Sequence, residues 1–255
     1  MISKRHDFKN IKNFSLFYGI GNSEELSKYD LTIVEPLGQN EISVKEMQAK
    51  GTLVIAYVSV VEIIEAFPHY KFLREEDFLK IDNNRVMNKE FNTYLINLKS
   101  ERWISILMHH IGNLILNSNY DGIFLDTMGD VEFSVFNEQQ QESLICGAVD
   151  FITKIREQYE DIIIIQNNGF NKLIESTFNF IDGVCWENPR LWDINNSDWI
   201  KYITGKLTNL SKEQMKVLLL YEENSFTSQE FAKINLAEKI AKINNFLIYK
   251  TESYC

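Results

Sequence analysis

The stretch Tyr120-Asp121-Gly122-Ile123-Phe124-Leu125-Asp126-Thr127 decides the fold class of this chain of 255 residues. An apolar run starts at Gly122, stops at the carboxylate of Asp126 and is followed by a polar loop. Runs that are apolar on both faces are typical of parallel strands that helices cover. Strand parity places Gly122, Phe124 and Asp126 on one side. In an α/β barrel, the carboxyl end of a strand faces the active-site mouth, so Asp126 is a candidate functional residue.

The same pattern recurs at Ile181-Asp182-Gly183-Val184-Cys185-Trp186-Glu187-Asn188-Pro189, where a short apolar run again ends on a carboxylate. Glu187 shares a side with the small residues of this run, whereas Trp186 points the other way unless a bulge intervenes. Between the two stretches, the apolar residues 162–165 run into Gln166-Asn167-Asn168-Gly169. Three successive strand ends therefore offer an Asp, an Asn and a Glu to one mouth.

Apolar runs and helical patterns alternate over the whole chain, which is typical of α/β folds. The predicted helices are residues 41–50, 102–117, 137–159 and 227–245, with Ser228 a candidate N-cap of the last. The predicted strands, one more than a closed eight-stranded barrel needs, are residues 14–18, 31–35, 53–58, 94–98, 122–126, 162–167, 183–187, 216–221 and 246–250. We therefore predict a (β/α)8 TIM-type barrel with one extra strand, either the first or the last, at an edge or beside the closure of the barrel.

No domain boundary is visible in the sequence. The chain has only three prolines and no linker rich in Gly and Ser, so residues 1–255 are predicted to form a single domain. Residues 189–214, which follow the seventh predicted strand, are interpreted as an elaborated loop with a short helix. Long loops at this end of such barrels shape binding clefts.

Composition limits the partners and cofactors. The formal net charge of −10 argues against nucleic acid as a partner, because its phosphates need Lys and Arg. The same charge is compatible with a cationic ligand, although solubility alone is the simpler explanation. Neither the cysteines nor the histidines have metal-ligand or disulfide spacing, so we expect no metal and no cofactor; they are Cys146, Cys185, Cys255, His6, His69, His109 and His110.

From the sequence we expect neither a signal peptide nor a transmembrane helix. Residues 1–9 lack the apolar core of a signal peptide, and no run of 18 apolar residues exists. As written, the chain is expected to be cytoplasmic with no membrane partner. A chain that had lost its export signal would look the same, and would then be extracellular or at the cell surface.

The carboxylates Asp126 and Glu187 are the residue types that glycoside hydrolysis needs. One carboxylate attacks or stabilises the anomeric carbon, and one carboxylic acid protonates the leaving oxygen. Side chains from strands two apart in a barrel can converge on its axis, close enough for this work. From the pattern alone, capping of the following loop is an equally good explanation for each carboxylate.

Other strand ends carry candidate substrate-binding residues. Glu35 and Glu62 follow the second and third predicted strands, where each could bind amines or hydroxyls of a substrate or pair with an Arg. Tyr18 and Tyr221 could hydrogen-bond a sugar or belong to the core. The tryptophans could stack on sugar faces, although a packing role is commoner for any one of them, and Trp192 is the best candidate for such a platform.

These segments together resemble the endo-α-1,4-polygalactosaminidase group, which is glycoside hydrolase family 114 and the related hydrolase domain of Pel polysaccharide biosynthesis. Six motifs occur in the family's order and cover most of residues 14–222, namely Phe17-Tyr18-Gly19, Tyr29-Asp30-Leu31-Thr32-Ile33-Val34-Glu35-Pro36, Ala56-Tyr57-Val58-Ser59-Val60-Val61-Glu62, Asp121-Gly122-Ile123-Phe124-Leu125-Asp126-Thr127, Gln166-Asn167-Asn168-Gly169 and Asp182-Gly183-Val184-Cys185-Trp186-Glu187. One departure is that Val61 stands where the family motif usually has Gly, which bears on the orientation of Glu62.

The resemblance implies a (β/α)8 barrel and endo-acting, retaining hydrolysis of polymers of α-1,4-linked galactosamine or N-acetylgalactosamine. It makes Asp126 the expected nucleophile and Glu187 the expected acid/base. The substrate-binding positions that it implies are Glu35, Tyr57, Glu62 and Asn167. Two other functions stay open: a carbohydrate-binding barrel that does not cut its ligand, and a glycosidase for a different sugar.

Overall fold

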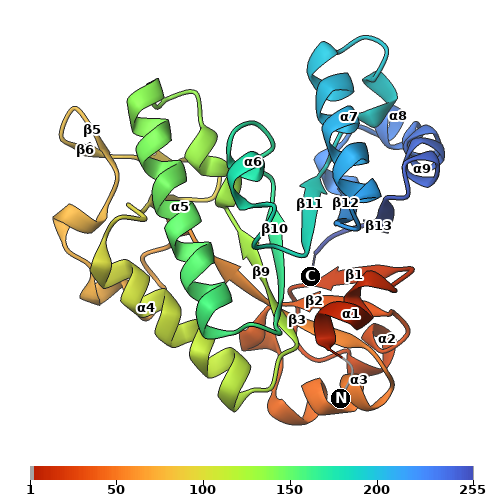
Figure 1. Cartoon of the computed structure of the whole chain (residues 1–255), viewed down its shortest axis with the longest axis horizontal. Helices are drawn as coiled ribbons and strands as arrows, with labels where there is room; N and C mark the ends of the chain where they lie inside the picture. The colour runs from red at the N-terminus through yellow and green to blue at the C-terminus, as the bar shows by residue number, and fades with distance from the viewer. Residues whose placement is uncertain (1–2, 255) are drawn as a thin grey trace.

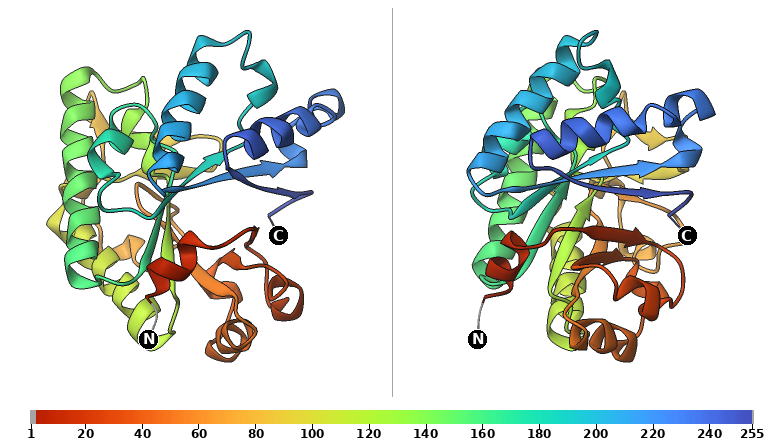
Figure 2. Two further views of the ribbon diagram at one scale, coloured as in Figure 1. Left: turned by 45° about the vertical axis from the view of Figure 1, so that its right-hand side comes forward. Right: turned by 90° about the vertical axis from the view of Figure 1, so that its right-hand side faces the viewer.

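Eight parallel strands form one sheet in the computed structural model, which describes residues 3–254. The ladder runs in the order β1 (Phe14–Phe17), β2 (Leu31–Val34), β3 (Leu53–Ser59), β9 (Gly122–Asp126), β10 (Ile163–Asn167), β11 (Gly183–Glu187), β12 (Lys216–Glu222) and β13 (Leu247–Thr251). The last strand returns to lie against the first, so the sheet curls into a nearly closed barrel (Figure 2). This confirms the predicted (β/α)8 fold.

Helices surround the barrel and connect its strands (Figure 1). They are α1 (Lys4–Lys9), α2 (Ser23–Leu26), α3 (Glu41–Ala49), α4 (Glu101–Gly112), α5 (Glu138–Gln158), α6 (Leu173–Thr177), α7 (Asp198–Lys212), α8 (Ser228–Phe231) and α9 (Ile234–Ile243). Several begin at the polar caps that the sequence provides. Asn137, for example, accepts a hydrogen bond from the backbone N–H of Gln140 at the start of α5.

The barrel strands other than β13 are largely buried on both faces, which explains their nearly continuous apolar runs. In β9, Phe124 belongs to a cluster inside the barrel, whereas Ile123 and Leu125 pack in the layer between the sheet and the helices. The same alternation holds in β11, where Cys185 lies inside and Trp186 outside. The parity predicted for Asp126 and Glu187 is therefore correct, because both follow inward-facing residues by two positions.

The amino-terminal end of the barrel is closed by α1, whose Phe8 is fully buried in the inner cluster. This end is held by the carboxylate of Asp182, which precedes β11. Asp182 accepts from Arg5 Nε at 2.7 Å, from Arg156 Nη2 at 2.7 Å and from the backbone N–H of Ile164 at 2.9 Å. Asp182 thus has a structural role at the end of the barrel opposite to Glu187.

Replacement of Asp182 should lower the stability of the protein without a direct effect on the catalytic groups. Asp182→Ala leaves the mostly buried guanidinium of Arg156 without its charge partner, so we expect the free energy of unfolding to fall by about 3 kcal/mol. Urea unfolding measures this value. The control is Glu41→Ala, which breaks an exposed pair with Lys45 and should change stability by less than about 0.5 kcal/mol. Equal stability of the two variants would contradict the assignment.

The position of the extra strand was predicted wrongly. It is neither the first nor the last candidate but the fourth, residues 94–98, which contributes β8 (Thr93–Leu95) to a small antiparallel sheet with β4 (Glu62–Ile63) and β7 (Met87–Asn88). This sheet and the hairpin of β5 (Lys80–Ile81) and β6 (Asn84–Arg85) form an insertion between β3 and α4. A short apolar run does not reveal the direction in which its strand pairs, so the sequence could not exclude it from the barrel.

Two helix predictions also need correction. Residues 189–214 contain the 15-residue helix α7 and not a short one, with Ile200, Ile203 and Leu207 buried at helical spacing. The predicted helix 227–245 is two helices, α8 and α9, with a break at Ala232 and Lys233. Its N-cap is Thr227, whose hydroxyl accepts from the backbone N–H of Glu230, and not Ser228.

Candidate active site

The ends of β9, β10 and β11 bring Asp126, Asn167 and Glu187 together. The side-chain amide of Asn167 donates to Asp126 Oδ1 at 2.6 Å and to Glu187 Oε2 at 3.1 Å. Asn167 is 3% exposed, whereas both carboxylates are half-buried and reach solvent. An amide nitrogen is the only end of Asn167 that can face two carboxylates without repulsion. One buried amide therefore bridges the two acids.

The backbone turns abruptly after each of these three residues. Thr127, Asn168 and Asn188, which directly follow Asp126, Asn167 and Glu187, have φ angles of +62°, +57° and +48°. Such left-handed conformations are uncommon outside glycine, and a β-branched Thr in one is a marked outlier. Thr127 is held there because its hydroxyl oxygen accepts from the backbone N–H groups of Val60 and Val61, at 3.2 and 2.8 Å.

Tyrosines surround the acid pair from the neighbouring strands. Tyr57, in β3, donates its hydroxyl to Asp126 Oδ2 at 2.8 Å. Tyr18, directly after β1, packs edge-on against the ring of Tyr57 with ring centroids 4.8 Å apart. Tyr254 follows β13 and donates to Glu187 Oε1 at 2.8 Å. All four oxygens of the two carboxylates thus accept a hydrogen bond from Asn167, Tyr57 or Tyr254.

The surroundings of Glu187 shift the pKa of this side chain. Burial raises the pKa of Glu187, and the charge of Asp126 raises it further, whereas the hydrogen bonds from Tyr254 and Asn167 lower it. The net direction is upward, which favours a protonated Glu187. The pKa of Tyr18 and that of Tyr57 are also raised well above the usual value, first by burial and then by Asp126, so both phenols stay neutral donors.

Two further acids predicted at this mouth have partners within the protein. Glu35 is half-buried, and its side chain accepts from the backbone N–H of Leu37 at 3.0 Å, while burial raises its pKa. Glu62 is 6% exposed and accepts from Asn88 Nδ2 at 2.8 Å and from the hydroxyl of Thr93 at 2.5 Å. Val61, in place of the family's Gly, has no left-handed φ, so its branched side chain is accommodated without strain.

Asp130 is an acid of this region that the sequence reasoning missed. Burial, a hydrogen bond with Glu62 and the charges of Glu62 and Asp126 together raise its pKa to about 9. Within residues 3–254 its Oδ2 atom is buried without a hydrogen-bond partner. Asp130 lies four residues beyond Asp126 in a short 3-10 helix, η5 (Met128–Glu132), and that proximity in sequence was the only available signal.

Three aromatic residues predicted to bind substrate are instead buried in the outer layer. Trp186 is 3% exposed and packs on Phe170, while Trp192 and Tyr221 are 8% and 0% exposed and lie 6.4 Å apart by ring centroids. Other side chains cover all three in this structure. Trp186 and Tyr221 lie on the outward side of their strands, and the segment around Trp192 packs onto the same outer layer.

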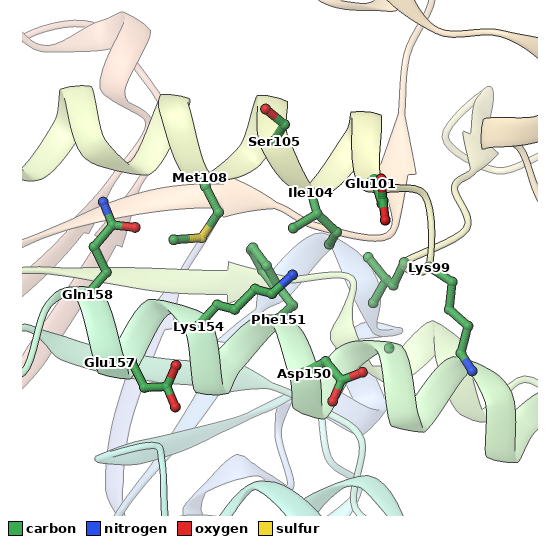
Figure 3. Close-up of a pocket in the computed structure, with 12 residues that line it drawn as sticks. Lys99, Glu101, Ile104, Ser105, Met108, Asp150, Phe151, Lys154, Glu157 and Gln158 are labelled. Carbon is green, nitrogen blue, oxygen red and sulfur yellow. The ribbon is translucent and has the colours of Figure 1, made fainter.

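A cavity of about 810 Å³ lies away from these acids, on the outer surface between α4 and α5 (Figure 3). Ile104, Met108 and Phe151 form its floor, and charged side chains such as Lys154 and Asp150 stand at its rim. None of the predicted site residues is among the residues that line it. This groove separates two packed helices and has no convergent set of catalytic groups.

Residues 3–254 hold no metal site, no disulfide and no membrane-spanning helix. No group of three or more His, Cys, Asp or Glu side chains in that range could hold a metal ion. The described thiols, Cys146 and Cys185, are free, and Cys255 lies outside the described residues. None of the helices within the described range combines the length and the apolar character that a bilayer crossing would need.

A TIM-type barrel with an Asp and a Glu bridged at its carboxyl-terminal mouth has the arrangement that glycoside hydrolysis by two carboxyl groups requires. The model of glycoside-hydrolase family GH114 matches residues 12–230, and the chain belongs to this family. The protein is therefore a glycoside hydrolase.

Solved structures agree with the fold. The glycoside hydrolase domain of PelA from Pseudomonas aeruginosa is 17% identical with a TM-score of 0.77, and the alignment covers 96% of each chain. Ega3 from Aspergillus fumigatus, in complex with galactosamine, is 13% identical with a TM-score of 0.69, covering 94% of this chain and 89% of that one. The α-galactosidase TtGalA from Thermus thermophilus, in complex with stachyose, is 12% identical with a TM-score of 0.61, covering 95% and 61%. No curated protein matches the chain.

Proposed function

We propose that this protein is an endo-acting, retaining hydrolase of polymers of α-1,4-linked galactosamine or N-acetylgalactosamine. Asp126 is the nucleophile and Glu187 the acid/base. The observation that carries this proposal is the single amide of Asn167 that hydrogen-bonds both carboxylates.

The shared amide limits the distance between the acids. Since Asp126 Oδ1 and Glu187 Oε2 lie 2.6 and 3.1 Å from one nitrogen, they are no more than about 6 Å apart. Retaining glycosidases hold their carboxyl groups about 5–5.5 Å apart, and inverting enzymes need about 6.5–9.5 Å to admit a water molecule. The spacing favours retention, in which a carboxylate forms a covalent glycosyl-enzyme.

The groups around each acid suit these roles. Asp126 Oδ1 attacks the anomeric carbon, and Tyr57 and Asn167 hold the carboxylate in place for that attack. Glu187, whose pKa is raised by burial and by Asp126, donates a proton to the leaving glycosidic oxygen. Glu187 is then a carboxylate and removes a proton from the water that releases the sugar from Asp126.

The proposed sugar rests on chemistry at the mouth and on the family. Acidic side chains near the pair, Glu35 and Glu62, together with a net charge of −10, suit a polymer that carries ammonium groups. The fold neighbour Ega3 was captured with galactosamine, which supports the same class of substrate.

Incubation with defined polymers tests this function. The enzyme should release oligosaccharides from α-1,4-linked galactosaminan or its N-acetylated form, measured as new reducing ends and by mass spectrometry of the products. Cellulose and starch serve as unrelated glycans and should give no more ends than the Asp126→Asn variant. Tight binding of galactosaminan without new ends would instead identify a carbohydrate-binding barrel. Cleavage of an unrelated glycan alone would identify a glycosidase for another sugar.

A further inference from the structure

The segment after β13 brings a residue into the active site from outside the family match. Family GH114 matches residues 12–230, whereas Tyr254 lies 24 positions beyond that match. After β13 the chain turns toward β1, across the seam where the first and last strands of the barrel meet (Figures 1 and 2). The acid pair is therefore contacted by a residue that lies beyond the matched region.

Three contacts fix the position of Tyr254. Its backbone carbonyl accepts from the N–H of Tyr18 at 2.5 Å, so the segment is tied to the end of β1. Its ring packs edge-on against the ring of Tyr18, with centroids 5.7 Å apart. Its hydroxyl donates to Glu187 Oε1 at 2.8 Å. The phenol is thus positioned by the barrel seam, and its one polar group is directed at the acid/base.

Within residues 3–254, no cationic side chain is among the groups that shift the pKa of Glu187. The titratable groups that face it come from β9, β11, β12, the end of β1 and the segment after β13, and they are Asp126, Cys185, Glu222, Tyr18 and Tyr254. Two of them are acids, which disfavour a charged Glu187. The hydrogen bonds from Tyr254 and Asn167 are what favour the charged form.

We propose that Tyr254 is a positioning residue for Glu187, which holds Oε1 of the acid/base through its hydroxyl and thereby makes the segment after β13 part of the active site. The inference rests on the role of Glu187 in the proposed function. Since Asn167 holds Oε2 from the opposite side, the carboxyl group is fixed at both oxygens before substrate binds. A fixed acid/base needs no reorientation when the proton moves, which favours turnover more than binding.

The hydrogen bond from Tyr254 to Glu187 should also shift the pH dependence of activity in a defined direction. A phenol that donates to Glu187 stabilises the carboxylate and so lowers its pKa, against burial and Asp126. Activity needs the protonated acid, so it is lost as the pH rises through the pKa of Glu187. Without the Tyr254 hydroxyl that pKa is higher, and the alkaline limb of kcat/KM must move to higher pH.

The test is Tyr254→Phe, which keeps the ring that packs on Tyr18 and removes only the hydroxyl. We expect the alkaline limb of kcat/KM on galactosaminan oligosaccharides to shift upward by about one pH unit, because hydrogen bonds to charged groups have roughly that effect. At the pH optimum of the wild type, kcat should fall about tenfold, with KM within about twofold. The control is Tyr29→Phe, which removes a phenolic hydroxyl that contacts neither carboxylate and should leave both limbs in place.

A second substitution reverses the sign. Tyr254→3-fluorotyrosine supplies a more acidic, stronger donor of nearly the same shape, so the alkaline limb should move to lower pH. A limb that stays in place in both variants would overturn the proposal. Failure of the proposed function is distinguishable, because Glu187→Gln would then keep full activity whatever Tyr254 does.

Discussion

Asp126→Asn is expected to lower kcat/KM by a factor on the order of 10⁴ or more on every substrate that the enzyme cleaves. The amide has the shape of the carboxylate but cannot form the glycosyl-enzyme, so the quality of the leaving group makes no difference. Polymer and an oligosaccharide with a nitrophenyl leaving group should both lose activity. Initial rates of reducing-end release and of nitrophenolate release measure the two effects.

The variant should remain folded, which makes the result interpretable. Asp126 is half-buried at the mouth, and in the variant the amide oxygen can still accept from Asn167 while the amide nitrogen donates to the Tyr57 hydroxyl, which can rotate to accept. Thermal unfolding should stay close to that of the wild type, in contrast to the loss expected for Asp182→Ala at the opposite end of the barrel. A folded Asp126→Asn enzyme with wild-type turnover would remove Asp126 from the mechanism.

Glu187→Gln is expected to have an effect that depends on the leaving group. Polymer hydrolysis needs a proton on the departing sugar oxygen, so its kcat/KM should fall by about 10²–10⁴-fold. A nitrophenolate leaves without that proton, so formation of its glycosyl-enzyme should be largely spared and the second step should become rate-limiting. A burst of nitrophenolate followed by a slow steady state, measured by stopped flow, would show this change.

Addition of azide distinguishes the loss of an acid/base from a general loss of activity in Glu187→Gln. A small anionic nucleophile needs no deprotonation, so azide should restore steady-state turnover of Glu187→Gln and form a glycosyl azide with the configuration of the substrate. Asp126→Asn is the matched control, because it lacks the nucleophile and cannot follow this two-step route. Equal losses on both substrates in Glu187→Gln, with no response to azide, would contradict the assignment of Glu187 as acid/base.

The meeting of Asp126, Asn167 and Glu187 at one mouth could be predicted because it follows from local sequence. In a parallel barrel, an acid at the carboxyl end of a strand lies at the barrel mouth. Because side chains alternate between the two faces of a strand, Asp126 and Glu187 point inward. Asn167 followed from the same rule. The sequence could not show that one amide would bond both acids, since this depends on the spacing of three strands in the closed barrel.

For the aromatic residues, the sequence did not reveal whether a side chain lies at the mouth or in the core. Alternation already indicated that Trp186 points outward, and the structure buries it against Phe170 and Trp199. Trp192 lies in a connection, where no period applies, and it packs on Tyr221 and Phe226. A tryptophan at a mouth and a tryptophan in a core look alike in sequence, because both are apolar residues near a strand end.

By itself, the sequence determined the barrel, its strand order along the chain and the inward side of each catalytic strand. Those properties follow from local patterns of apolar residues and carboxylates. Only the tertiary structure decided which candidate strand lies outside the barrel. It also decided that Asp130 lies beside Glu62 and that Tyr254, beyond β13, contacts Glu187. The physical reason is that these are contacts between segments distant in the chain, such as the 67 positions between Glu187 and Tyr254. No local periodicity records such a contact, because it exists only once the barrel has brought its first and last strands together.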